Sequence, residues 1–275
     1  MTNKFHLTFD VDLHLLWTGT YHRTALGELS RGEFGLKVGL PRVLEVLKEE
    51  NVSATFFIPG KIGELFPNKV KEIHDAGHEV AVHGYAHERW NELSYEEEYE
   101  LIKKSKQILE NITGQEIDGF RSPAWSLNDK SVEILKELDF KYDSSLMAND
   151  YELYHLRTDD YMTLDGELHF GEETDLIEIP VSWELDDFPY FCFTGKNVGL
   201  RSTKDVLECW KLEVDSSIKF GSYFTLTMHP QIIGRGPRIL MLQELIQYIK
   251  SYKDIKFITL KEAFEYGRNK DGIIL

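Results

Sequence analysis

Cysteine is scarce in this chain of 275 residues, which contains only Cys192 and Cys209. The two do not form a Cys-x-x-Cys pair, and nothing around them indicates a disulfide framework. This argues against a small disulfide-stabilised extracellular scaffold and favours a reducing compartment.

Positive charge is also in short supply, because 31 lysines and arginines stand against 47 aspartates and glutamates, a formal net charge of -16. Such a field repels phosphate backbones, so we expect no nucleic-acid partner. No stretch approaches the roughly 18 consecutive apolar residues of a membrane span. The first residues lack the basic and long apolar regions of a secretory leader. We therefore expect a cytoplasmic protein with no membrane partner.

Hydrophobic residues make up 42% of the chain, enough to bury a large core, and we expect a single catalytic domain over residues 1–275. Short apolar runs alternate with stretches of helical period, which predicts βα units around a parallel sheet. The fold class is therefore α/β, a distorted (β/α) barrel with seven or eight parallel strands. Strands are expected at 5–9, 53–58, 79–83, 117–121, 141–144, 176–181, 223–228 and 256–258. Helices are expected at 40–49, 69–76, 94–110, 128–138, 202–218, 237–251 and 260–266.

The segment 146–175 is too irregular to form one clean βα unit, which is why the barrel is expected to be distorted. A second irregular segment, 13–39, follows the first strand and is long for a compact domain. It is open to two interpretations, a lid or subunit contact on one side and an ordinary surface excursion on the other.

Asp10 and Asp12 end the first expected strand, and their spacing of two places both carboxylates on one side of extended backbone. Like charges so close are stabilised by a cation, which one carboxylate can ligate while the other remains free as a base. The alternative is a capping aspartate beside a surface aspartate.

His83 and His87 follow the third expected strand with a spacing of four, which places both rings on one face of a helical turn. This pair at a strand end favours a metal site. His74 and His78 have the same spacing, but they lie on and just after a helix, so we interpret them as surface residues or caps.

Arg121 ends another apolar run and could orient a carboxylate, or it could form a surface ion pair of little energetic value. His229 ends a buried strand near the C-terminus, where a barrel displays its catalytic residues. It suits a general acid, and a satisfied core histidine is the alternative.

Four motifs in chain order resemble the polysaccharide deacetylase family, carbohydrate esterase family 4. They are residues 8–12 (Thr-Phe-Asp-Val-Asp), 83–87 (His-Gly-Tyr-Ala-His), 121–123 (Arg-Ser-Pro) and 226–229 (Leu-Thr-Met-His). The resemblance implies Asp10 as general base, held by Arg121, and His229 as general acid. The metal ligands it implies are Asp12, His83 and His87, with zinc as the expected divalent ion.

The chain departs from the family pattern in three places. Val11 separates the two aspartates, Gly84 replaces the usual serine or threonine, and Pro180 stands where an acidic residue is expected. The acidic partner of His229 must then come from elsewhere, and among Glu184, Asp186 and Asp187 we prefer Asp187. The Asp-Val-Asp form and the 186–190 stretch resemble an intracellular branch that includes allantoinase-like and cyclic-imide hydrolases, and that branch tends to form homotetramers.

The expected function is hydrolysis of a non-peptide carbon–nitrogen bond, with removal of acetyl from an N-acetylated sugar as the first hypothesis. Ring opening of a cyclic imide or ureide is the alternative. A non-haem iron enzyme and a non-catalytic binding protein are further classes. The substrate is expected to be a small molecule or an oligosaccharide. Substrate contacts are assigned to Trp125, Trp183 and Pro123, and Trp17 is a further candidate for the mouth, with core packing as the alternative for the tryptophans.

Overall fold

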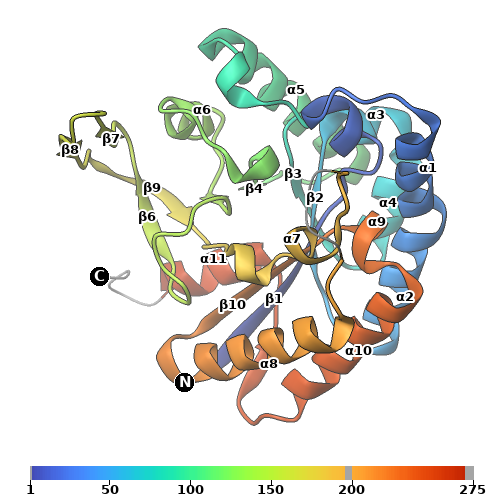
Figure 1. Cartoon of the computed structure of the whole chain (residues 1–275). Helices are drawn as coiled ribbons and strands as arrows, with labels where there is room; N and C mark the ends of the chain where they lie inside the picture. Colours follow the sequence, from blue (N-terminus) through green and yellow to red (C-terminus); the bar gives the residue numbers. More distant parts are fainter. Residues whose placement is uncertain (1, 196–199, 270–275) are drawn as a thin grey trace.

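In the computed structural model, which describes residues 2–195 and 200–269, a curved sheet forms the centre of the molecule and helices cover its outer face (Figure 1). Its strands run in the order β10-β1-β2-β3-β4-β5-β9-β6, and β11 also pairs with β1. Every neighbouring pair is parallel except β6 with β9. The parallel strands are β1 (Asn3–Asp10), β2 (Thr55–Ile58), β3 (Glu79–Val82), β4 (Gly119–Phe120), β5 (Tyr142–Asp143), β9 (Glu173–Glu178), β10 (Tyr223–Met228) and β11 (Ile255–Phe257). The expected barrel of seven or eight parallel strands is confirmed.

The distortion of the barrel comes from the segment 146–175. It contains β6 (Tyr154–Arg157), which runs antiparallel to β9 at the end of the sheet. Within the described residues no pairing joins β6 to β10, so the barrel stays open at that edge. Beyond β6 the chain forms a separate hairpin of β7 (Tyr161–Met162) and β8 (Leu168–His169), which projects away from the helices (Figure 1).

The helices follow the apolar periodicity of the sequence. The longest, α5, begins after a capping box, in which Ser94 accepts from the Glu97 N–H and the Glu97 carboxylate accepts from the Ser94 N–H. It ends at Gly114, whose positive φ suits a left-handed cap. The α-helices are α1 (Leu26–Phe34), α2 (Leu40–Glu49), α3 (Gly60–Leu65), α4 (Pro67–Asp75), α5 (Tyr95–Thr113), α6 (Ser131–Glu137), α7 (Asp187–Phe191), α8 (Thr203–Phe220), α9 (Pro230–Ile233), α10 (Gly236–Lys250) and α11 (Leu260–Asn269).

The segment 13–39 is helical rather than irregular. It forms a π-helix at Leu16–Thr20, α1 at Leu26–Phe34 and a second π-helix at Gly35–Gly39 that runs directly into α2. Gly39 is needed there, because a Cβ at this position would lie 2.0 Å from the carbonyl oxygen of Pro230. The segment therefore packs closely on α9.

Strand β1 is buried along almost its whole length, between β10 on one side and β2 and β11 on the other. Its apolar side chains, Phe5, Leu7 and Phe9, belong to the main hydrophobic core. The alternate positions face the opposite side of the strand and end in Asp10. In the described part of the chain, no helix is long and apolar enough to cross a membrane.

Candidate metal centre and active site

The two aspartates lie at the carboxyl end of β1. Both are almost fully buried, with 2% of Asp10 and none of Asp12 exposed. Their side chains diverge in environment. Asp10 accepts a hydrogen bond from Arg121, whereas neither carboxylate oxygen of Asp12 has a hydrogen-bond partner among the described residues. A buried carboxylate without donors is costly, which points to a cation as its partner.

The two histidines reach Asp12 from the loop that follows β3. This loop has left-handed backbone at Gly84 and His87, with φ of 63° and 62°. The Glu88 carboxylate fixes the loop by accepting from the backbone N–H groups of Tyr85 and Ala86. Gly84 suits its position, because a Cβ there would lie 2.9 Å from Cγ of Pro123. The positive φ and the close contact with Pro123 explain why position 84 is glycine and not the serine or threonine that is usual in the family pattern.

Three ligand atoms converge at this point. His83 Nε2 lies 3.3 Å and His87 Nε2 3.5 Å from Asp12 Oδ1. His83 Nδ1 donates to the carbonyl oxygen of Arg121, so its Nε2 carries the lone pair in the neutral ring. The hydroxyl of Thr20 donates to the carbonyl oxygen of His87 and contacts His87 Nδ1. Since the hydroxyl has a single proton, it accepts from Nδ1–H, and the lone pair of the neutral His87 ring is on Nε2. Three acceptors that face one another fit a divalent ion, and the outer hydrogen bonds of the two histidines orient their rings for it.

The pKa shifts agree with this electrostatic picture. Burial alone would raise the pKa of Asp12, but the neighbouring histidines outweigh burial and hold it below its usual range. Burial lowers the pKa of His87 to about 4, which keeps this ring neutral and able to ligate. For His83, burial acts downward, yet the Asp10 and Asp12 carboxylates raise its pKa. An ionised Asp12 carboxylate and a neutral His87 ring are the forms in which these side chains would bind a cation.

Arg121 is completely buried, so the interpretation as a surface ion pair is wrong. One Nη atom lies 2.9 Å from Asp10 and 2.8 Å from the Thr8 hydroxyl, and it donates to both. Its other N–H groups donate to the carbonyl oxygen and the hydroxyl of Ser144. The guanidinium also stacks over the Phe57 ring at 4.1 Å. This fixes one oxygen of Asp10 and leaves the other toward the candidate metal site.

His229 enters the site from the end of β10, opposite the two metal-site histidines. Its Nδ1 lies 2.6 Å from Asp187 Oδ1, and its backbone N–H donates to Asp187 Oδ2 at 3.1 Å. Burial alone would lower the pKa of His229, but Asp187 raises it well above its usual value. Asp186 caps α7 through the Phe188 N–H and lies 3.6 Å from His229 Nδ1, whereas Glu184 is exposed. The structure thus brings Asp187 to the histidine, seven residues after Pro180.

A cavity of about 150 Å³ connects these groups. Trp125 and Trp183 form one wall, with ring centroids 4.3 Å apart, and 43% of Trp183 is exposed. Pro123 does not line the cavity and packs behind Gly84 instead. The residues lining the cavity are Asp10, Asp12, Leu16, Thr20, Tyr21, His83, His87, Ala124, Trp125, Trp183, Asp186, Phe188 and His229.

The segment 13–39 supplies part of this wall, through residues other than Trp17. Leu16, Thr20 and Tyr21 all come from its first π-helix and the residue that follows. Trp17 is buried in the core and does not line the cavity, so core packing is the correct interpretation for it. No sequence motif distinguishes Thr20, because its role depends on a contact with His87 across the fold.

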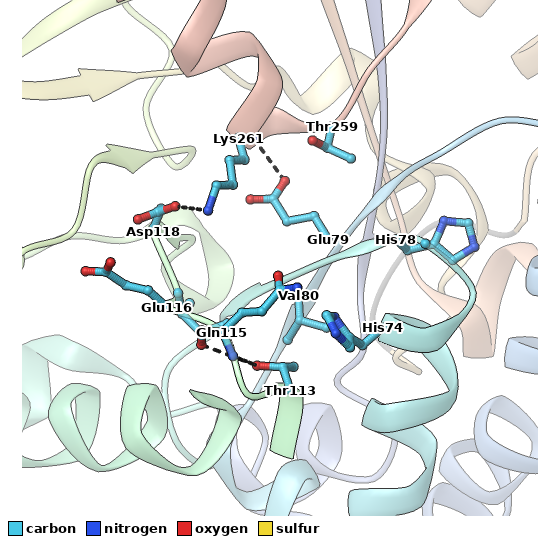
Figure 2. A pocket seen from close by; sticks show the side chains of 12 residues that line it. His74, His78, Glu79, Val80, Thr113, Gln115, Glu116, Asp118, Thr259 and Lys261 are labelled. Atoms are coloured by element: carbon cyan, nitrogen blue, oxygen red, sulfur yellow. Dashed lines mark hydrogen bonds and ion pairs between the residues drawn. The ribbon is translucent and has the colours of Figure 1, made fainter. Parts of the chain in front are cut away.

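A second cavity of about 360 Å³ lies at the opposite end of the strands, near the start of β3 and the approach to β4 (Figure 2). Lys261 forms an ion pair with Asp118, and Glu79 accepts from the Lys261 N–H. His78, expected at the surface, is instead 7% exposed and packs on Phe56, and burial lowers its pKa to about 4. This cavity gathers no metal-ligand cluster within the described residues.

Known proteins resemble this chain in sequence over most of its length. A family model described as polysaccharide deacetylase matches residues 33–142. A peptidoglycan deacetylase of Helicobacter pylori is 34% identical over 269 residues, which cover 92% of this chain and 92% of that protein. The chain belongs to the polysaccharide deacetylase family. The family resemblance inferred from the four motifs is therefore confirmed.

Solved structures agree with this family membership. A Mycobacterium smegmatis protein assigned as a polysaccharide deacetylase is 32% identical, with a TM-score of 0.85, covering 97% of this chain and 90% of that one. An allantoinase superposes with a TM-score of 0.82 over 98% of this chain and 91% of that one. At 18% identity, the allantoinase shows a shared fold alone.

Proposed function

We propose that this family member is a metal-dependent hydrolase that removes the acetyl group from an N-acetylated sugar. The observation that carries the proposal is the convergence of His83 Nε2, His87 Nε2 and the unpartnered Asp12 carboxylate, with Asp10 and His229 on either side. A divalent ion bound there, for which we favour zinc, would polarise the substrate carbonyl and acidify water. Peptidoglycan deacetylation in the Helicobacter pylori relative supports the bond type.

The side chains of this chain then divide the proton transfers. Asp10 is the general base that removes a proton from the attacking water, and Arg121 holds it in place by the 2.9 Å contact. His229 donates a proton to the departing nitrogen from Nε2, because its Nδ1 is engaged by Asp187. Asp187 thereby fixes the ring orientation and stabilises the imidazolium. Trp125 and Trp183 offer flat faces for a sugar ring.

A second candidate, ring opening of a cyclic imide or ureide, is favoured by the size of the cavity. At about 150 Å³ it suits one small ring better than a polymer strand. Both reactions use the same base, acid and metal ligands. We propose a cytoplasmic location, which also favours a small molecule or an oligosaccharide over an external polymer.

The test is to incubate the purified protein with N-acetylated oligosaccharides and with cyclic imides, with and without a chelator. Acetate release that stops with chelator and returns with zinc supports deacetylation. If only the imide is turned over, the result favours ring opening of a cyclic imide or ureide over deacetylation. Activity that is indifferent to chelator would overturn metal dependence, and the absence of any turnover would favour a binding protein.

We further propose that the protein forms a homo-oligomer, with a homotetramer as the favoured assembly. The β7–β8 hairpin exposes apolar side chains, and an isolated two-stranded hairpin is marginally stable in water. The most exposed are Met162, Leu164, Leu168 and Phe170. Light scattering on wild type and on Leu164→Glu tests this proposal, because a wild-type species of the 32.0 kDa chain mass would contradict it.

A further inference from the structure

Four arginines gather on one side of the barrel, where α1, α2, α9 and the start of α10 pack together (Figure 1). They are Arg31, Arg42, Arg235 and Arg238, and we call them the arginine cluster. Arg235 is exposed and the other three are half-buried. In a protein of net charge -16, such a concentration of positive charge is a local exception.

The contacts of the side chains show that the cluster is compact. Arg42 donates to the carbonyl oxygen of Gly234, the residue before Arg235. The Arg235 guanidinium lies 3.6 Å from the ring centroid of Phe34, which stands one helical turn after Arg31 on α1.

The other two arginines meet on the segment after α7. Arg238 stacks on Phe191 at 4.5 Å, and Arg31 reaches the next two residues, through Cys192 Sγ at 3.5 Å and the carbonyl oxygen of Phe193 at 2.8 Å. Arg235 and Arg238 are three residues apart and link the two halves of the cluster.

None of the four has a carboxylate partner in the described part of the chain. The arginine ion pairs found there use Arg23, Arg89, Arg121 and Arg157. Burial lowers the pKa of Arg235 and of Arg238, and nearby guanidinium groups add to this effect. The Asp187 carboxylate acts in the opposite direction on Arg238, which keeps a lowered pKa overall. Among the described residues, the mutual repulsion of these arginines is therefore offset only in part. An anion of high charge density would offset it.

The start of α10 adds a second feature favourable to an anion. No side chain caps this 15-residue helix, and no acidic residue lies in its first turn, which contains Arg238. The positive end of the helix dipole adds to the arginine charge. Guanidinium groups match the oxygens of phosphate in a bidentate fork, which a single ammonium does not.

The cluster lies next to the active site without being part of it. Arg31 stacks on Trp17 at 4.0 Å, Trp17 stacks on Tyr21, and Tyr21 lines the catalytic cavity. We propose that the arginine cluster binds a phosphate or pyrophosphate group, either free or carried by the substrate. Phosphate binding is measured without turnover, so this claim stands apart from the proposed deacetylation.

The first experiment is calorimetric titration of the full chain with inorganic pyrophosphate at about 0.1 M salt. We expect one site per chain in the wild type and at least a tenfold weaker affinity in R42Q/R235Q, because two charge-assisted contacts are lost. The control is K48Q/K253Q, which removes two exposed charges from elsewhere and should stay within about twofold of wild type. R235Q alone, which changes an exposed side chain, should show a smaller loss in the same direction and covers the case in which the double variant fails to fold.

The absence of wild-type binding, or equal weakening in the lysine control, would overturn the proposal, because only nonspecific attraction would remain. The proposal would also be overturned if wild type does not bind pyrophosphate and R42Q/R235Q forms a smaller assembly than wild type. The arginines would then contact a second copy of the chain.

A second experiment separates the two sources of phosphate once pyrophosphate binding depends on the cluster. N-acetylglucosamine 1-phosphate and N-acetylglucosamine are compared as substrates. If the substrate carries the phosphate, R42Q/R235Q raises KM for the phosphorylated sugar alone and leaves kcat unchanged. If free phosphate is the ligand, the variant treats both sugars as wild type does. Either result supports the anion site.

Discussion

The division of labour between Asp12 and Asp10 leads to a prediction about zinc-linked stability. Asp12 Oδ1 lies within 3.5 Å of both histidine Nε2 atoms, whereas Asp10 is held by Arg121 and lies 3.8 Å from His83. We therefore expect Asp12→Asn to lose zinc and Asp10→Asn to keep it. A neutral amide is a poorer ligand for a dication than a carboxylate.

The expected magnitude follows from mass action. At a zinc concentration of 100 times the wild-type Kd, zinc stabilises the folded wild type by about 2.7 kcal/mol. Losing one of three ligands should weaken binding at least about 100-fold, as much as the largest effects of outer-shell partners. Zinc at the same concentration then stabilises Asp12→Asn by only about 0.4 kcal/mol. For a chain of this size, the difference corresponds to roughly 5–9 °C in the zinc-induced shift of Tm.

The assay is thermal unfolding followed by circular dichroism, in chelator and again in zinc, for wild type and both variants. Each variant is compared with itself, so any change in metal-free stability cancels. Asp10→Asn is the matched control, two residues away on the same strand end, and it should retain the full zinc shift while losing about 10²- to 10⁴-fold in turnover. A full zinc shift in Asp12→Asn, with none in Asp10→Asn, would reverse the two roles and refute the reasoning.

Three further predictions follow from the site and its surroundings. Asp187→Asn should keep zinc but lower kcat by about 10²- to 10⁴-fold, since His229 loses its orienting carboxylate; steady-state kinetics with metal analysis checks this. Gly84→Ala should cost at least 1 kcal/mol, because φ is 63° and Pro123 is in the way, and denaturant unfolding measures it. His78 is buried with a pKa of about 4, so its contribution is present above the unfolded value near 6.5 and is lost as pH falls. Urea unfolding should show His78→Gln losing roughly 1.5 kcal/mol less stability than wild type between pH 6.5 and 5.

The sequence predicted the strands well because each is a short apolar run whose end is marked by a polar residue. The runs before Asp10, His83, Arg121 and His229 became β1, β3, β4 and β10, and parallel pairing brought their carboxyl ends to one edge. Residues more than 200 positions apart therefore meet without any local signal beyond a strand end.

Residue spacing alone could not distinguish the two histidine pairs. His74 and His78 have the same spacing as His83 and His87, but His78 precedes β3 and packs against Phe56, whereas His83 follows the strand. The end of the strand at which a histidine lies decides its environment. The alternation of residues predicted the strand β3, but it did not predict that His78 would be buried against Phe56.

The remaining features depended on how irregular segments fold back. Thr20 reaches His87 through a π-helix, a conformation for which the sequence gives no periodic signal. Asp187 could be preferred but not separated from Asp186, because the start of α7 decides which carboxylate faces His229. Such choices are made by tertiary packing.

The position of β1 in the sheet has a consequence for how the protein is synthesised. Strand β1 leaves the ribosome about 200 residues before its partners β10, which contains residues 223–228, and β11, which contains residues 255–257. Until those segments emerge, one edge of a hydrophobic strand is exposed, and such edges recruit other strands. A nascent or truncated chain that stops before Tyr223 would contain Asp12, His83 and His87 but not the neighbour that encloses them. We therefore expect the last quarter of the chain to determine whether newly made protein folds or aggregates.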